Sequence, residues 1–262
     1  MSHPLHRYLR SEVLPTPFCP GCGNGLVAGA FLRAVAKAGH ADLRNFAFVS
    51  GIGCASWIPS PCFRGDTLHV AHGRALPTAL GIKLYRPDLQ VVVIGGDGDI
   101  AGIGGNHLLH AARRNADLLV IMVNNLVYAM TGGQVGPTTP AGLPTTTTPY
   151  GNPERPMDTA AVVAAAGANY VARWSVAHLR ELERSLAKGL SKRGFRFIEV
   201  LSQCPARVGG KLKMEPARFL RWWKEQGTTS APTTPDQFFL GELADRDEPG
   251  FVEALRARKV SA

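Results

Sequence analysis

The sequence lacks any hydrophobic run long enough to cross a membrane and any basic stretch of the kind that binds nucleic acids. No apolar segment approaches the roughly 20 residues that a spanning helix requires, and basic residues are not interleaved with aromatic ones. The N-terminal residues His3, His6, Arg7 and Arg10 come without the apolar core of a secretory signal. We therefore expect a cytoplasmic protein that binds neither membranes nor nucleic acids.

Acidic residues are also scarce, because 20 aspartates and glutamates stand against 29 lysines and arginines, for a formal net charge of +9. Such an excess can serve surface solvation alone or a docking surface for an acidic protein, and composition leaves both interpretations open. The hydrophobic content of 45% is ordinary, and 262 residues suffice for one α/β domain with extensions. Internal repeats are absent.

Segments with strand and helix patterns alternate along the chain. Apolar stripes with helical spacing predict helices over residues 24–38, 75–83, 104–114, 158–167 and 175–190, and a short packed helix around Phe219, Trp222 and Trp223. Runs of β-branched and aromatic residues predict strands over 46–49, from Val91 to the glycines at 95–96, and over 118–123, 169–172 and 195–201. This alternation is typical of an α/β fold with a doubly wound parallel sheet.

The remaining segments divide the chain. We expect an extended lead-in over residues 1–18, the α/β domain over 19–210, and a C-terminal extension over 211–262 that contacts a partner. Within the domain, residues 131–156 are rich in Gly, Pro and Thr and predict a long loop, which is usually functional in a compact domain. The Thr- and Pro-rich stretch 228–235 predicts a tail.

The most informative segment runs from Val91 to Asn125. One β-branched run ends in Gly96-Asp97-Gly98-Asp99, and the next apolar run ends in Asn124-Asn125. Two parallel strands would place Asp97 and Asn125 at neighbouring carboxyl ends, where open α/β sheets bind ligands. A carboxylate, an amide oxygen and backbone carbonyls suit Mg²⁺ that carries a phosphate. The alternative is a turn aspartate and a strand-end asparagine in an ordinary dinucleotide-binding type of fold.

Five cysteines lie at positions 19, 22, 54, 62 and 204, and the first two form a Cys-Pro-Gly-Cys turn ahead of a predicted helix. A redox dithiol, a zinc site and an iron–sulfur cluster compete here. No strand immediately precedes the pair, which disfavours the redox dithiol. Thiolates from Cys19, Cys22, Cys54 and Cys204 would suit either Zn²⁺ or a [4Fe–4S] cluster, and spacing does not separate the two. We interpret Cys62 as a buried structural residue.

Together these motifs carry a family resemblance over roughly residues 15–210. The spacing of Gly-Asp-Gly and Asn-Asn resembles the diphosphate-binding motif of thiamine diphosphate enzymes. In combination with the cysteines the sequence is similar to the β subunit of a 2-oxoacid:ferredoxin oxidoreductase. The segments that match, in order, are residues 18–24, 50–54, 72–75, 96–99, 124–125, 131–134 and 202–205.

The resemblance implies the diphosphate-type thiamine diphosphate fold and three bound groups. It assigns a [4Fe–4S] cluster to Cys19, Cys22, Cys54 and Cys204, and leaves Cys62 unassigned. It assigns Mg²⁺ to Asp97, Asn125 and the backbone carbonyl of Val127. The residues that it places along thiamine diphosphate are Ile52, Gly53, Cys54, Ala55, His72, Gly73, Arg74, Ala75, Gly98, Asp99, Met130 and Thr131. Taken alone, His72 and Arg74 fit a simple turn and surface role better than a cofactor role.

By resemblance, the activity is a coenzyme A-dependent oxidative decarboxylation of a 2-oxoacid that passes electrons to ferredoxin. The glutamate that activates thiamine diphosphate has no place in this one-domain chain, so the resemblance implies a separate α subunit that supplies it. Some relatives carry a basic residue three positions after the third cluster cysteine, where Trp57 stands here. The pattern around Cys54 favours 2-oxoglutarate, with pyruvate and branched 2-oxoacids as alternatives.

Two rival functions remain open at this point. A non-redox thiamine diphosphate-dependent 2-oxoacid decarboxylase would keep Asp97 and Asn125 but would not need four cysteines at these positions. A zinc-stabilised, non-catalytic subunit would account for the cysteines and leave the diphosphate motif without a role. The metal content of the protein distinguishes the three.

Overall fold

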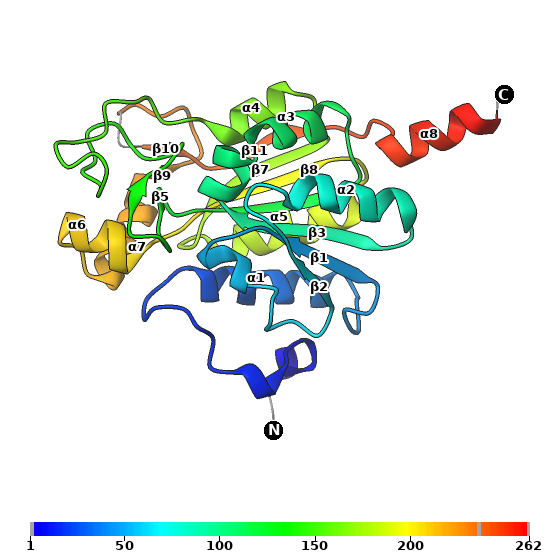
Figure 1. Ribbon diagram of the computed structural model, residues 1–262, viewed down its shortest axis with the longest axis horizontal. Coiled ribbons are helices and arrows are strands. Elements are labelled where there is room, and N and C mark those ends of the chain that lie inside the picture. The colour runs from blue at the N-terminus through cyan, green and yellow to red at the C-terminus, as the bar shows by residue number, and fades with distance from the viewer. Residues whose placement is uncertain (1–2, 235–236, 261–262) are drawn as a thin grey trace.

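A seven-stranded sheet runs through the molecule, in a computed structural model that describes residues 3–234 and 237–260 (Figure 1). The strand order is β11-β7-β8-β4-β3-β1-β2, and every neighbouring pair is parallel except β11 with β7. The ends of the predicted lead-in and extension, and Pro235 of the predicted tail, lie outside the described residues. The strands are β1 (Phe46–Ser50), β2 (Asp66–His69), β3 (Gln90–Gly96), β4 (Leu119–Asn124), β7 (Tyr170–Ser175), β8 (Arg196–Leu201) and β11 (Gly241–Asp245).

Helices cover both faces of this sheet, which confirms the predicted doubly wound architecture. One face packs against α1 (Asn24–Lys37) and α5 (Leu179–Ser191), and α7 (Pro216–Gln226) adds Phe219 and Trp223 to the same core. The other packs against α2 (Ala75–Tyr85), α3 (Gly105–Arg113) and α4 (Thr159–Ala165). Among the residues that the structure describes, no helix is long and apolar enough to span a membrane.

Shorter elements complete the chain. The two-residue pairs are β5 (Val127–Tyr128) with β6 (Gln134–Val135), and β9 (Gly227–Thr228) with β10 (Phe238–Phe239). Helical turns occur at Pro4–Tyr8, Ser11–Val13 and Cys54–Trp57, π-helices at Gly98–Ile103 and Pro205–Gly209, and α-helices at α6 (Gly210–Leu212) and α8 (Phe251–Val260). The lead-in therefore contains short helical turns, and its Tyr8 is buried in the core with its hydroxyl donating to the carbonyl of His40 at 2.6 Å.

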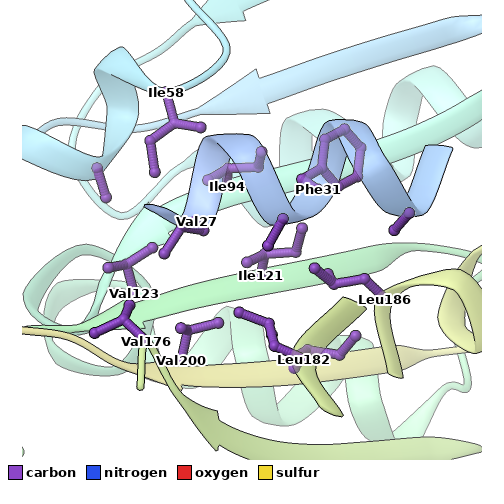
Figure 2. Packing of buried hydrophobic residues seen from close by; sticks show 14 of the residues in the cluster. Val27, Phe31, Ile58, Ile94, Ile121, Val123, Val176, Leu182, Leu186 and Val200 are labelled. Carbon is purple, nitrogen blue, oxygen red and sulfur yellow. The ribbon is translucent and has the colours of Figure 1, made fainter. Parts of the chain in front are cut away.

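The larger core lies between the sheet and helices α1 and α5 (Figure 2). Phe31 of α1 and Leu186 of α5 point onto Ile94 and Ile121 of the central strands. Successive residues of a strand face opposite sides of the sheet. Val93, which precedes Ile94 in β3, therefore packs in the second core, between the sheet and helices α2, α3 and α4. Because both faces are covered, the central strands are apolar without interruption.

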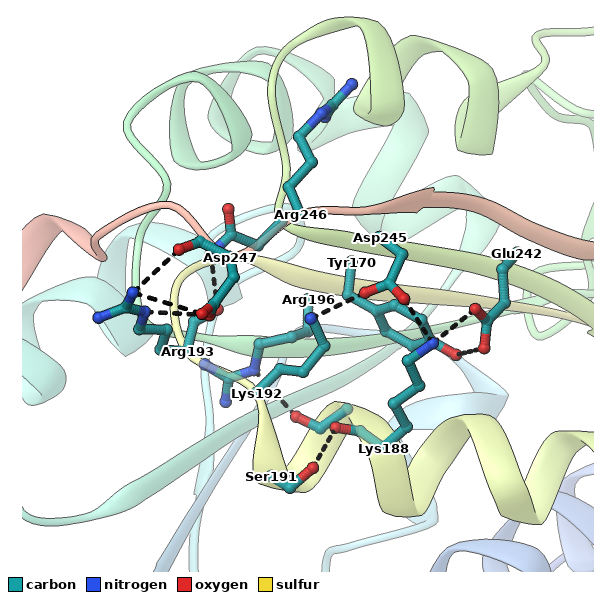
Figure 3. A network of polar contacts seen from close by, with 12 residues as sticks. Tyr170, Lys188, Ser191, Lys192, Arg193, Arg196, Glu242, Asp245, Arg246 and Asp247 are labelled. Carbon is teal, nitrogen blue, oxygen red and sulfur yellow. Dashed lines mark hydrogen bonds and ion pairs between the residues drawn. The ribbon is translucent and has the colours of Figure 1, made fainter.

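The edge strand β11 was not predicted. It pairs antiparallel with β7, and Lys188 of α5 holds it by ion pairs to Glu242 at 2.6 Å and Asp245 at 2.7 Å (Figure 3). Tyr170 of β7 also donates a hydrogen bond to Glu242 at 2.9 Å. Only Ala244 of this strand is buried, so the sequence carries no hydrophobic alternation there. Part of the predicted C-terminal extension thus completes the main sheet.

Removal of the Phe31 ring should destabilise the fold strongly. The ring is fully buried and packs against Phe48 and Phe63 with ring centroids 5.8 Å away in each case. We expect Phe31→Ala to lower the free energy of unfolding by about 3–5 kcal/mol in denaturant titrations. The control Tyr85→Ala removes a ring that is 87% exposed and should change it by no more than about 0.5 kcal/mol. Equal losses in the two variants would contradict this description of the core.

Candidate functional site

The residues singled out by sequence gather at one edge of the sheet, where the carboxyl ends of five adjacent strands meet. In spatial order, His72 follows β2, Cys54 follows β1, Asp97 follows β3, Asn125 follows β4 and Cys204 follows β8. The register pairs Gly96, the last residue of β3, with Val123, one residue before the end of β4. The predicted proximity of Asp97 and Asn125 is therefore present, and the cysteines lie on either side of it.

Asp97 is a buried carboxylate, with only 1% of the residue exposed. Its Oδ2 accepts a hydrogen bond from the Thr138 hydroxyl at 2.6 Å, and its Oδ1 accepts one from the backbone N–H of Asn125 at 3.3 Å. Burial raises its pKa to about 6. No lysine or arginine among residues 3–234 and 237–260 forms an ion pair with it. A buried carboxylate without an ion pair is unfavourable when it is charged, so Asp97 favours a bound cation.

The turn after β4 presents Asn125 and Val127 to the same pocket. The Asn125 side-chain oxygen accepts the backbone N–H of Val127 at 3.2 Å. Between them Leu126 adopts a φ of 74°, in the left-handed region that a branched residue rarely occupies. The Thr139 hydroxyl donates to the carbonyl of Leu126 and stabilises this conformation. Local strain of this kind commonly marks ligand-binding turns.

A helix begins directly after Asp97. The π-helix Gly98–Ile103 leads into α3, so its first N–H groups and positive dipole end face the pocket, an arrangement that binds phosphate. Gly98 allows close packing at this point, because a Cβ there would lie 2.2 Å from the ring of Tyr128. The sequence therefore needs a glycine beside Asp97 for steric reasons.

Asp99 lines the pocket and connects three segments around it. Its Oδ1 accepts the backbone N–H groups of Gly73 at 2.7 Å and Ile52 at 3.2 Å, and it lies 2.6 Å from His72 Nδ1. Its Oδ2 is buried without a hydrogen-bond partner. Asp99 thus holds the turns after β1 and β2 against the π-helix.

The resulting pocket has a volume of about 90 Å³. Gly73, Arg74 and Ala75 do not line it; Arg74 is exposed, and Gly73 and Ala75 are buried beside His72. Gly96, Tyr128 and Ala129 line it in addition to the predicted set. The predicted residues that line it are Ile52, Gly53, Cys54, Ala55, His72, Asp97, Gly98, Asp99, Asn125, Val127, Met130 and Thr131.

A second pocket of about 110 Å³ is lined by Cys19, Cys22, Cys54 and Cys204. Cys62 lies elsewhere, in the hydrophobic core, where its thiol contacts the carbonyl of Trp57 at 3.7 Å. The four thiols come from three separate parts of the chain. The structure thus brings together the four cysteines that the resemblance grouped and separates the fifth.

Hydrogen bonds clamp the Cys19–Cys22 turn to the segment before Cys204. Gln203 donates from Nε2 to the carbonyl of Gly21 at 3.1 Å, and its own carbonyl accepts the N–H of Gly23 at 3.3 Å. Gly21 has a φ of 76°, and a Cβ there would clash with Pro216 of α7 at 2.4 Å. The first and last cysteines are therefore held at a fixed separation.

Two opposing effects act on the thiols of this pocket. Burial raises the pKa of Cys22 to about 11 and also raises the pKa values of Cys54 and Cys204. Backbone N–H groups oppose this at Cys22 and Cys204, where they favour the thiolate. The side-chain amide nitrogen of Asn24, which also lines the pocket, is a buried donor without a partner. These features suit a group that replaces the thiol protons and accepts hydrogen bonds.

The two pockets share a wall formed by Cys54, Asn125, Ala129 and Met130. Groups bound on the two sides would be separated by little more than one layer of side chains. The arrangement therefore places a site with oxygen ligands directly beside a site with thiolate ligands.

Sequence reasoning missed a buried polar chain behind Asp97. The Thr138 hydroxyl also lies 2.9 Å from Oδ1 of Asn124, whose amide donates to Glu199 Oε1 at 2.8 Å. Arg173 Nε in turn donates to Glu199 Oε2 at 2.7 Å. Two features of the sequence could have indicated this chain: a glutamate inside the apolar run of β8, and a Thr-Thr pair in the long loop. The sequence does not show which residues these side chains bond to.

Comparisons with known proteins agree with this geometry. The family model "Thiamine pyrophosphate enzyme, C-terminal TPP binding domain" matches residues 51–200. The chain is 49% identical to 2-oxoglutarate synthase subunit KorB of Methanothermobacter thermautotrophicus over 97% of this chain and 91% of the relative. It is 47% identical to the protein of the same name from Methanocaldococcus jannaschii over 97% and 96%.

The chain is a β subunit of the 2-oxoacid:ferredoxin oxidoreductase family. A solved structure described as 2-oxoglutarate:ferredoxin oxidoreductase from Magnetococcus marinus, with 2-oxoglutarate, coenzyme A and succinyl-CoA bound, superposes on this β subunit with a TM-score of 0.87. The two chains are 30% identical, and the match covers 98% of this one and 90% of the other. The predicted family, fold and oxidoreductase class are confirmed, and the family model supports thiamine diphosphate as a cofactor.

The hydroxyl of Thr138 should matter for cofactor binding in this β subunit. Replacement by valine removes the donor to Asp97, and a hydrogen bond to a charged group contributes about 1.5 kcal/mol or more. We therefore expect Thr138→Val to weaken Mg²⁺-dependent thiamine diphosphate binding about tenfold in calorimetric titrations. Thr138→Ser keeps the hydroxyl and should stay within about twofold of wild type. Identical affinities for both variants would rule out this role.

Proposed function

We propose that this chain is the thiamine diphosphate- and [4Fe–4S]-binding subunit of a heteromeric enzyme that oxidises 2-oxoglutarate with coenzyme A and ferredoxin, in the cytoplasm. The observation that carries the proposal is the pair of pockets with a common wall. One holds a buried carboxylate beside a helix start, and the other holds four thiols. A thiamine diphosphate fold alone does not require the second pocket.

The residues at the sheet edge would form two binding sites. Asp97, Asn125 and the Val127 carbonyl would hold Mg²⁺, and the N–H groups at Gly98 and Asp99 would face the diphosphate. Cys19, Cys22, Cys54 and Cys204 would hold the cluster. When bound, thiamine diphosphate supplies the nucleophile and electron sink for decarboxylation, and a [4Fe–4S] cluster accepts electrons one at a time. The protein contributes the fixed distance between the two sites through Cys54 and Asn125.

The donor arrangement favours a cluster over a single zinc ion. The four thiols surround a cavity of about 110 Å³. Zinc requires four ligands at a single centre about 2.3 Å from each sulfur. A non-redox decarboxylase would leave this thiol pocket unexplained.

The site depends on a partner. No glutamate is among the described residues that line the Asp97 pocket, so the glutamate that activates the cofactor would come from an α subunit. Three large apolar side chains at the rim are exposed to a degree unusual beside a site: Ile52 at 42%, Trp57 at 40% and Met130 at 46%. We expect the α subunit to cover them, together with the loop 131–156 and parts of the C-terminal extension 211–262. The +9 charge would favour an acidic ferredoxin.

Cluster loss should follow the grouping of the cysteines. Cys54→Ser and Cys204→Ser should lose the broad visible absorbance and the iron of the anaerobically purified protein, expected at about four atoms per chain for [4Fe–4S]. The matched control Cys62→Ser changes a thiol outside the pocket and should keep both. A colourless Cys62→Ser variant beside an intact Cys204→Ser variant would overturn the assignment.

Activity should require two polypeptides. Expressed alone, the chain should not reduce an artificial acceptor with any 2-oxoacid and coenzyme A, because the activating glutamate is missing. Co-expression with the α subunit should restore turnover, with 2-oxoglutarate preferred over pyruvate. Turnover by this chain alone, with no second polypeptide in mass spectra, would contradict the divided site.

A further inference from the structure

A third cavity adjoins the Asp97 pocket. It has a volume of about 330 Å³ and lies between the long loop and the segment after Cys204. Val127 lines it and also lines the Asp97 pocket.

The charge of this cavity is entirely positive. Of the described residues that line it, only Arg207 and Lys211 are ionisable, and none is a carboxylate. Within the part of the chain that the structure describes, neither side chain forms an ion pair. Two unpaired cations that face one cavity attract an anion.

Arg207 is fixed in place although it is exposed. Its Nε donates to the carbonyl of Ala129 at 3.3 Å, and its stem packs against Gly133, where a Cβ would lie 3.2 Å from the Cβ of Arg207. Gly133 has a φ of 91°, which favours glycine for a second reason. Because Nε is engaged, the two terminal nitrogens remain as a donor pair for a carboxylate or phosphate.

The rest of the cavity suits an extended organic anion. Leu143, Pro144 and Val208 supply an apolar wall, and the Thr146 side chain is exposed at the rim. A free inorganic ion would not need the apolar wall. An acyl or pantetheine chain that ends in an oxyanion would use both parts.

We propose that Arg207 and Lys211 form an oxyanion subsite that binds the charged end of one of the two anionic substrates. The anion is either the distal carboxylate of a 2-oxodicarboxylic acid or a phosphate of coenzyme A. The proposal rests on the proposed function. It also gives a positive residue near the site to a chain that has Trp57 where some relatives have a basic residue.

The test uses the co-expressed heteromer with an artificial electron acceptor. Arg207→Ala should raise one KM about tenfold with kcat changed by less than about twofold, since the lost contact is to a remote part of the substrate. If the anion is the carboxylate, the KM for 2-oxoglutarate rises and that for 2-oxobutyrate, which lacks the distal carboxylate, does not. If it is a phosphate, the KM for coenzyme A rises and that for pantetheine does not. Arg207→Lys keeps the positive charge, so its KM should lie between those of wild type and Arg207→Ala.

Arg180→Ala is the matched control, because it removes an arginine from an exposed position on α5 outside all three pockets. It should leave every KM unchanged. Unchanged KM values in an active Arg207→Ala enzyme, equal changes for the charged and uncharged analogues, or a change seen only with ferredoxin would each overturn the subsite. An inactive wild-type heteromer would instead overturn the proposed function, and this inference with it.

Discussion

The parallel alignment of β2, β1, β3, β4 and β8 is the constraint on which the rest of the structure depends. Parallel strands point their carboxyl ends to the same edge, so the turns that follow them must converge. Asp97, Asn125, Cys54 and Cys204 lie within that convergence although up to 150 residues separate them in sequence. Helices on both faces bury the strands and hold this alignment rigid.

The convergence of these turns buries a carboxyl group and several thiols whose charged forms are unfavourable without a bound cation. Asp97 is buried and has no basic partner in the part of the chain that the structure describes, and burial raises the pKa values of three thiols nearby. Hydrogen bonds from Thr138 and from backbone N–H groups offset part of that cost. Metal and cluster binding would offset the remainder, so we expect cofactor binding and stability to be closely linked in this chain.

The same edge is open on its outer side. Ile52, Trp57 and Met130 are exposed there beside a buried carboxylate, which is the pattern expected of a half-site that a second polypeptide completes. The positively charged cavity at Arg207 continues this edge beyond the long loop. One sheet edge thus carries the cofactor pockets, the exposed rim and the proposed oxyanion subsite.

Periodicity predicted most of the main elements in order, and the turns at the strand ends predicted the proximity of Asp97 to Asn125. These are local signals, and adjacent parallel strands translate them directly into a site. The family resemblance also grouped Cys204 with Cys19 and left Cys62 out, and the structure places the four grouped cysteines at one pocket. The tertiary structure alone revealed that Thr138 and Glu199 support Asp97. It also added β11, which has no hydrophobic alternation. These contacts join residues far apart in the chain through single hydrogen bonds or packed side chains, and such pairings leave no periodic trace in the sequence.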